Sequence, residues 1–590
     1  MEKNRESLLN GQFKFKILPD GALDKTKVTC IYCKGEFNYH RSNSSLLYHL
    51  KAKHPGVLKS DSGSRQTTLE QYRTRGGVNS EQTNKRITDA ITCWIATNCR
   101  PVNIVEDAGL CEVIKAATGD TTYKLPARKT IMSRVEELYD NKRTEKLEAL
   151  GKVPYVSLTG DHWTSFGNDN YLGVTAHFID NDWCLQSFAL TVSKTTERHY
   201  AEACAQHFED IAQDWGIENK VTTLGTDSAR NMVAAVRQLP YEHLPCTAHA
   251  IQRSICVSLS DSGIDAVLAK CRKLVGHFKH SPSNTRELNA QQVAHHQKEE
   301  PLIQDVPTRW NSTLAMIQRV LQNREPIGAT LREQHSKLSM LTDQECAKLQ
   351  RLSELLEPCR YVTEILGGEH YISCSVVLPA FCHLFRVMEP SEDDPVHIVK
   401  WKKLFSEDLA KRKENSNLAW LKLATALDPR FKDLKCLPKT ERGDVWNSIA
   451  DLLKEKEKPK APSPETTDVP DVPAKKAKVF LLSSSDSDAD EEEETNLSLI
   501  NRYRSETKLE MDACPLQWWL NRKGSYGKLA LLARKYLSSP ATTVPCERLF
   551  SLSGHVVQKK RASLSSANVE RLVCLSSWLK VKDKGKGQVG

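Results

Sequence analysis

The hydrophobic residues between positions 151 and 246 follow the pattern of a sheet flanked by helices. Three runs rich in β-branched and aromatic residues are separated by the turn clusters Asn168–Asn170 and Asp180–Asp182, so we expect antiparallel strands there. A helical pattern follows, and then two shorter apolar runs, each with a helical pattern behind it. The five predicted strands cover residues 155–159, 171–179, 184–192, 221–225 and 242–246.

This order of three strands, a helix, a strand, a helix, a strand and a helix describes an RNase H-like mixed sheet in residues 151–265. Helical spacing dominates the rest of the chain. It predicts helices in residues 84–150, an all-helical stretch over 266–454, and further helices in 513–580. The predicted fold class is therefore multidomain α+β.

Other segments lack periodicity. Residues 1–22 and 581–590 are expected to be tails, and 59–83 a linker rich in Ser, Gly, Arg and Thr. Residues 455–512 are rich in Pro, Lys, Ser and acidic residues, and we expect disorder.

A short motif stands out within the acidic linker. The apolar run Val479, Phe480, Leu481, Leu482 precedes an acidic stretch and resembles a SUMO-interacting motif, which adds to a partner as an edge strand. The alternative is a chance apolar tetrad. A short basic patch, Lys475–Lys478, lies just before it and is compatible with nuclear import.

Composition narrows the class of protein. The net charge of +9 is a mild basic excess, concentrated in residues 1–58 and 557–590, while 483–494 is acidic. The 18 cysteines are scattered except for one close pair, as expected of reduced thiols in the cytosol or nucleus. With no long apolar run and no apolar signal core, we expect neither a secreted disulfide scaffold nor a membrane protein.

The close cysteine pair belongs to a pattern of metal ligands. Cys30 and Cys33 are followed by His49 and His54, in the spacing C-x2-C-x15-H-x4-H. Two thiolates on a tight turn and two imidazoles one helical turn apart suit a structural, tetrahedral Zn²⁺ site. The alternative is a pair of stray cysteines and two histidines on a helix surface.

Basic and polar residues surround these ligands and indicate an interface with double-stranded DNA. The alternative partner is a protein. The aromatic pair Phe13 and Phe15 and the stretch Ser44–Leu50 resemble a BED-type zinc finger, which we place at residues 23–58. The predicted DNA contacts are Tyr39, His40, Arg41, Asn43, Lys51 and Lys53.

Two carboxylates follow predicted strands of the sheet. Asp161 comes after the first strand and Asp227 after the fourth. If those strands are parallel neighbours, both carboxylates emerge at one sheet edge, where they could bridge Mg²⁺ or Mn²⁺ ions for phosphodiester chemistry. The alternative is that both are turn or N-cap residues.

An ordered set of motifs resembles the hAT transposase superfamily over residues 85–580. The motifs are Asp161-x-Trp163-Thr-Ser, Thr226-Asp227-x3-Asn231-Met232, Cys246-x2-His249, Thr308–Thr313, Leu427–Lys432 and Pro540–Ser551 followed by Lys560, Arg561 and Leu564. The resemblance implies an RNase H-like core interrupted by a large all-α insertion, and a C-terminal dimerisation region.

The resemblance also implies site residues. Glu547 would be the third carboxylate, Trp310 an aromatic that stacks on an extruded base, and Arg309 a phosphate contact. The alternatives are a helix-dipole role for Glu547 and a core position for Trp310. Cys246 and His249 are interpreted as structural.

The C-terminal helices carry wide apolar faces that would be costly to expose. The residues concerned are Trp518, Trp519, Leu531, Leu532, Leu572, Leu575 and Trp578. They are expected either to dimerise, which would pair two zinc fingers on two half-sites, or to pack on the sheet.

The hypothesis from the sequence is a nuclear, homodimeric, zinc-dependent, sequence-specific DNA-binding protein of hAT descent that regulates transcription. The alternative is an active cut-and-paste transposase that uses a two-metal Asp/Asp/Glu site. A SUMO-pathway factor is a weaker alternative, resting on residues 479–486 alone.

Overall fold

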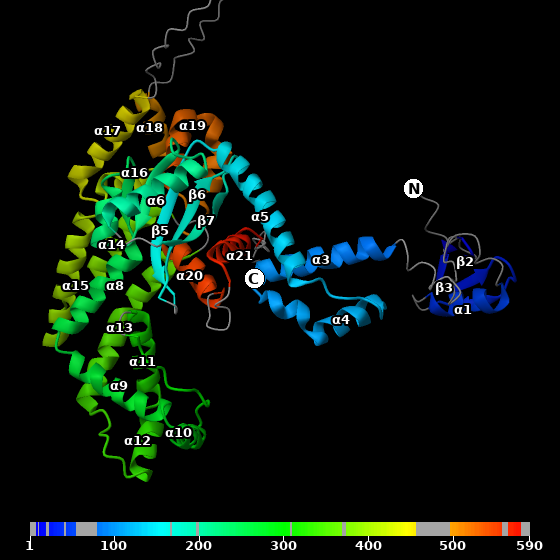
Figure 1. Ribbon diagram of the computed structural model, residues 1–590, viewed down its shortest axis with the longest axis horizontal. Coiled ribbons are helices and arrows are strands. Elements are labelled where there is room, and N and C mark those ends of the chain that lie inside the picture. The colour runs from blue at the N-terminus through cyan, green and yellow to red at the C-terminus, as the bar shows by residue number, and fades with distance from the viewer. Residues whose placement is uncertain are drawn as a thin grey trace, which may run out of the picture. The chain divides into compact units, whose positions relative to one another are not determined.

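A computed structural model describes residues 7–9, 11–18, 23–39, 43–54, 79–165, 168–195, 200–306, 309–368, 373–455, 496–556 and 564–579. The chain divides into two compact units, Met1–Ile87 and Thr88–Gly590, and Figure 1 shows the elements of each. The SUMO-motif-like tetrad lies outside the described residues, as do His40 and Arg41. None of the described helices combines the length and apolarity needed to cross a membrane.

Within its described residues up to His54, the first unit is a small sheet covered by a helix. Its antiparallel strands lie in the order β1-β2-β3-β4. They are β1 (Ser7–Leu8), β2 (Phe13–Ile17), β3 (Leu23–Cys30) and β4 (Glu36–Asn38), and the helix is α1 (Ser44–Lys53). Five side chains form its core: Phe13, Val28, Cys30, Leu46 and Leu50.

The expectation that residues 1–22 form a tail is wrong, because they contribute two strands of this sheet. Phe13 is the physical reason. Its side chain is fully buried and pairs edge-to-face with Phe37, so the small core needs the strand that carries it.

The second unit is built on a five-stranded sheet with the order β7-β6-β5-β8-β9. Its strands are β5 (Val156–Thr164), β6 (Asn170–Ile179), β7 (Leu185–Thr195), β8 (Val221–Thr226) and β9 (Glu242–Pro245). β5, β6 and β7 are antiparallel, whereas β8 runs parallel to both β5 and β9. The RNase H-like mixed sheet is thus confirmed.

Two glycines let helices approach this sheet closely. A Cβ on Gly160 would lie 2.5 Å from the ring of Phe208, and one on Gly173 would lie 2.7 Å from the ring of Phe550. The connecting helices are α6 (Ala201–Asp214), α7 (Arg230–Val236) and α8 (Thr247–Asp261).

The regular elements in the described part of the insertion are helices, and Figure 1 shows them extending from the sheet. They are α9 (Asp265–Lys279), α10 (Pro282–Ala294), α11 (Trp310–Gln322), α12 (Arg324–Glu333), α13 (Asp343–Leu366), η3 (Cys374–Val376), α14 (Val377–Val387), α15 (Val396–Glu414), α16 (Leu418–Ala426) and α17 (Lys439–Glu455).

The helices that flank this body come from both ends of the chain. They are α3 (Asn79–Asn98), η2 (Val102–Glu106), α4 (Ala108–Thr118), α5 (Arg128–Gly151), α18 (Asn496–Ser505), α19 (Pro515–Leu537), α20 (Val544–Val556) and α21 (Ser566–Leu579). The expectation of disorder throughout 455–512 is therefore wrong at its end. Leu499, Ile500 and Tyr503 bury α18 in the main core.

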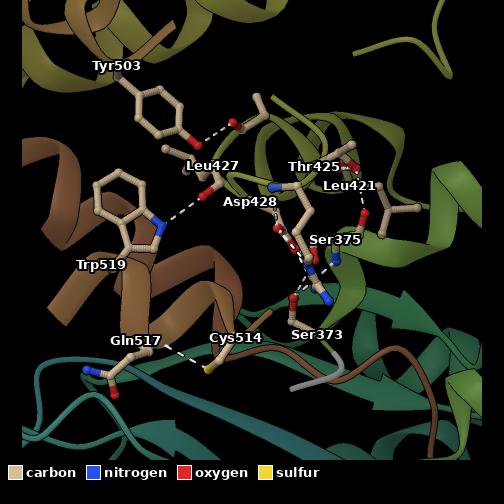
Figure 2. A network of polar contacts seen from close by, with 12 residues as sticks. Ser373, Ser375, Leu421, Thr425, Leu427, Asp428, Tyr503, Cys514, Gln517 and Trp519 are labelled. Atoms are coloured by element: carbon tan, nitrogen blue, oxygen red, sulfur yellow. Dashed lines mark hydrogen bonds and ion pairs between the residues drawn. The ribbon is translucent and has the colours of Figure 1, made fainter. Parts of the chain in front are cut away.

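Buried polar contacts dock α18 and α19 onto the insertion, as Figure 2 shows. The indole of Trp519 donates to the Leu427 carbonyl at 2.9 Å, and the Tyr503 hydroxyl donates to the Ala426 carbonyl at 3.1 Å. Next to these carbonyls, the fully buried Asp428 accepts a hydrogen bond from Ser375 at 2.7 Å. The Leu427–Lys432 motif is thus a structural junction.

The C-terminal apolar faces pack within the chain itself. Trp518, Trp519, Leu532, Leu572, Leu575 and Trp578 are all buried, whereas Leu531 is 45% exposed. The Trp578 indole donates to the Ala189 carbonyl of β7 at 2.8 Å and its ring stacks on Tyr139 of α5. Packing of α21 against the sheet therefore accounts for its apolar face.

Candidate functional site

The four predicted zinc ligands converge. One potential ligand atom from each of Cys30, Cys33, His49 and His54 lies within 4.8 Å of the others. The two cysteines flank a tight turn in which the Lys34 amide donates to the Cys30 carbonyl at 3.0 Å, and Lys34 has a φ of 61°. The two histidines come from the second half of α1 and from the residue that follows it.

The donor set fits a zinc ion. Cys33 Sγ lies 3.2 Å from His49 Nε2, and His54 Nε2 is a buried polar atom with no hydrogen-bond partner. The neighbouring His54 imidazole and the Gly35 amide lower the pKa of Cys33 to about 6, so its thiolate is available to a metal at neutral pH. A closed set of two thiolates and two imidazoles is typical of a structural site.

Four of the six predicted DNA contacts lie within the described residues, and these four fall into two groups. Lys51 and Lys53 are exposed on α1. Tyr39, in contrast, packs edge-to-face on Phe15, and the Asn43 side-chain oxygen is buried, so these two residues contribute to the fold.

Sequence reasoning missed Tyr48. It is 75% exposed on α1, one helical turn before Lys51 and on the same face. The signal was available, because Leu46 and Leu50 mark the opposite, buried face.

In the second unit, Asp161 and Asp227 reach the same level of the sheet. Asp161 lies within β5, not after a strand as the sequence suggested, because β5 continues to Thr164. Asp227 directly follows β8. The two strands are parallel, and Thr159 is the register partner of Gly225. Each carboxylate is two residues beyond its partner residue.

Glu547 joins this carboxylate cluster (Asp161, Asp227 and Glu547) from the first turn of α20. Burial, followed by the charges of Asp227 and Glu547, raises the pKa of Asp161 to about 7. His249 Nε2 lies 3.8 Å from Glu547 Oε1. A hydrogen bond with Cys246 raises the pKa of His249 to about 9, so at neutral pH it is a cation beside the acids.

Two buried cysteines hold the segments of the cluster together. The amide of Cys246 donates to the Thr226 carbonyl at 2.9 Å, and its Sγ accepts from the Thr543 amide at 3.3 Å. The Cys546 thiol donates to the Thr159 carbonyl at 3.2 Å. The cysteine of the Cys246-x2-His249 motif is therefore structural, whereas its histidine faces the acids.

The three carboxylates do not form a ready metal site in this structure. Among the described residues, the Cys2His2 set is the one group of three or more His, Cys, Asp or Glu side chains arranged so that they could hold a metal ion. Asp227 Oδ1 accepts from the Ala229 amide at 3.1 Å, as its turn-residue interpretation predicts, and Asp161 Oδ1 accepts from the His162 amide at 2.8 Å. We therefore derive no metal-dependent step from this geometry.

The expected base-stacking role of Trp310 is not available in this structure, because its side chain is 1% exposed within the main core. It begins α11, and its amide donates to Gln252 Oε1 at 3.2 Å. Arg309, directly before it, is exposed and remains accessible to a phosphate.

Four known families match parts of the chain. Residues 15–55 match the BED zinc finger, and residues 159–253 match the ZBED1 RNase-like domain. Residues 244–355 match the ZBED1 RNase-like helical domain, and 499–579 match the hAT family C-terminal dimerisation region.

Similar proteins include the "Putative AC transposase" of Zea mays, 27% identical over 94% of this chain and 72% of the relative. The "Zinc finger BED domain-containing protein 4" of Homo sapiens is 23% identical over 94% of this chain and 50% of the relative. The "Putative transcriptional regulator tpeD" of Talaromyces stipitatus is 24% identical over 83% of this chain and 62% of the relative. From these matches and the fold, the chain is a BED-finger protein derived from the hAT transposases.

Proposed function

We propose that this protein is a nuclear, zinc-dependent, sequence-specific DNA-binding protein that regulates transcription as a homodimer. The observation that carries the proposal is the convergence of Cys30, Cys33, His49 and His54 in a module that matches the BED zinc finger. The exposed α1 side chains Tyr48, Lys51 and Lys53 supply an aromatic ring and two cations to the DNA groove or backbone. A relative named as a transcriptional regulator supports the regulatory role.

Homodimerisation is supported by the match of residues 499–579 to a dimerisation region. Most large apolar side chains of that region are buried within the chain. Among its described residues, Met511 and Leu531 remain 60% and 45% exposed. A dimer contact would therefore use such exposed positions, and Leu531→Glu is expected to shift the sedimentation of the full chain from dimer to monomer. A dimer that persists with its zinc and fold intact would exclude Leu531 from the contact.

The finger's role is tested by in-vitro selection of duplexes with the zinc-loaded full chain. Cys33→Ser should abolish zinc retention and selective binding, whereas Cys184→Ser should change neither. Cys184 is the matched control because it is also exposed but lies in the second unit. Selective binding that survives Cys33→Ser would overturn the proposal.

A second candidate function is Mg²⁺-dependent DNA cleavage, which requires the carboxylates of Asp161, Asp227 and Glu547 to move closer together than this structure holds them. The parallel register of β5 and β8 favours it, since it sets Asp161 and Asp227 at one level. The test is a nicking assay on the selected duplex with Mg²⁺ or Mn²⁺. Nicking that vanishes in Asp161→Ala but persists in Asp169→Ala would establish cleavage by the carboxylate cluster. If no metal-dependent nicking is detected, this second candidate function is excluded and regulation is the one that stands.

A further inference from the structure

A small cavity lies in the helical insertion, away from the carboxylate cluster. Its volume is about 170 Å³, and its lining combines α14, the turn after α16 and the segment between α18 and α19. The charged side chains that line it are Arg386, Arg430, Asp433, Lys435 and Lys508. The wall therefore carries four cationic side chains, contributed by three segments, and one carboxylate.

Arg430 is a rigid part of this wall. Its Nε and Nη2 donate to the two oxygens of Asp428 at 3.0 and 2.7 Å, and its side chain is 8% exposed. The Ser375 hydroxyl also donates to Asp428 Oδ2, at 2.7 Å, so the carboxylate itself is held in place. The bonds to Asp428 do not involve Nη1, and because Arg430 lines the cavity, Nη1 is the donor that a ligand could use.

The other three cations are exposed and have no acidic partner. Within the described part of the chain, Arg386, Lys435 and Lys508 form no ion pair. Counting Asp428 and Asp433 against the four cations leaves an excess of two positive charges around the cavity. Such an excess, next to a preorganised guanidinium, favours binding of an anion with two negative charges.

We propose that this cavity binds a phosphate monoester dianion, with Arg430 Nη1 and the three exposed cations as its ligands. The group carried by the phosphate would lie on the apolar part of the wall, which Pro379 and Phe431 provide. A DNA phosphodiester fits less well, because it carries a single charge and is flanked by sugars on both sides. A phosphorylated side chain and a nucleotide share the monoester chemistry, and the proposal goes beyond the DNA-binding function of the finger.

The test uses the full zinc-loaded chain and follows phosphorus NMR line widths of inorganic phosphate, O-phosphoserine and AMP. Saturable broadening is expected with the wild type. The double variant Arg386→Gln, Lys508→Gln should weaken binding about tenfold or more, because two charge-assisted contacts are lost. Lys279→Gln, an exposed cation outside the cavity, should leave the affinity unchanged.

Each outcome decides the proposal. A stronger response to O-phosphoserine assigns a phosphorylated side chain, and a stronger response to AMP assigns a nucleotide. Absence of saturable broadening with all three probes overturns the proposal, as does equal weakening in Lys279→Gln. Displacement of the probes by dimethyl phosphate at equal concentration would also overturn it and assign the cavity to a diester. An unchanged unfolding midpoint in the double variant confirms that the fold is intact.

Discussion

Thr159 of β5 and Gly225 of β8 are register partners in the parallel pair at the centre of the sheet. Two residues beyond them the chain reaches Asp161 and Asp227. The backbone pairing thus sets the relative height of the two carboxylates. Glu547 is brought to them separately, through the contacts of Cys246 and Cys546.

The first prediction concerns pH. The pKa of Asp161 is raised from 3.8 to about 7 by burial and by Asp227, so the folded protein holds a proton that the unfolded chain has already lost. Stability should therefore fall as pH rises from about 4 to 7, by up to about 4 kcal/mol from this group. The difference in unfolding free energy between wild type and Asp161→Asn, measured by urea titration across this range, should show the slope.

The matched control is Asp169→Asn, whose carboxylate pairs with Lys194 at the surface. Its difference from wild type should vary little over the same range. If the Asp161→Asn difference is also flat with pH, the two acids do not share the buried environment described above.

The second prediction concerns close packing. A Cβ on Gly173 would lie 2.7 Å from the Phe550 ring, which belongs to the helix that carries Glu547. Gly173→Ala should destabilise the body by about 1–3 kcal/mol through overpacking. Gly151→Ala, with no atom within 4 Å of the added Cβ, should be neutral or slightly stabilising. Equal unfolding midpoints for the two variants would contradict the close approach of α20.

The third prediction concerns the junction in Figure 2. Asp428→Asn should cost about 3–5 kcal/mol, because it leaves the buried Arg430 guanidinium without its counter-charge. Asp433→Asn, five residues on and exposed, should stay within about 0.5 kcal/mol of wild type. Thermal unfolding of the two variants measures this, and similar midpoints would argue against the ion pair as a structural contact.

The fourth prediction concerns metal removal. Chelation should unfold the finger and leave the body intact, because the finger core comprises five fully buried side chains whereas the body has a large core of its own. Hydrogen exchange should therefore lose protection in β3 and α1 and keep it in β5 and β6. Protection of β3 and α1 that persists without zinc would show that the finger does not depend on its metal.

The sequence predicted the order of strands and helices along residues 151–265 and the zinc ligands, because both depend on local signals, namely apolar runs, turn clusters and ligand spacing. The strand that carries Phe13 was missed. It is only five residues long and alternates with lysines, and nothing local in the sequence shows that the core of the finger requires the Phe13 ring. The sequence also placed Trp310 on DNA, whereas burial by the insertion helices decides its position. Helix α18 was missed because its apolar side chains follow directly on an acidic, Ser-rich segment.

The carboxylate cluster is assembled from residues that are nearly four hundred positions apart in the chain, from Asp161 to Glu547. The ribosome must therefore synthesise the whole insertion before the cluster can close, whereas the finger precedes all three carboxylates in the chain. A messenger cut short anywhere in the insertion would still encode the finger. If the DNA binding proposed above resides in the finger alone, such a product would bind the same DNA sites as the full protein while lacking the body, and the two would compete for those sites.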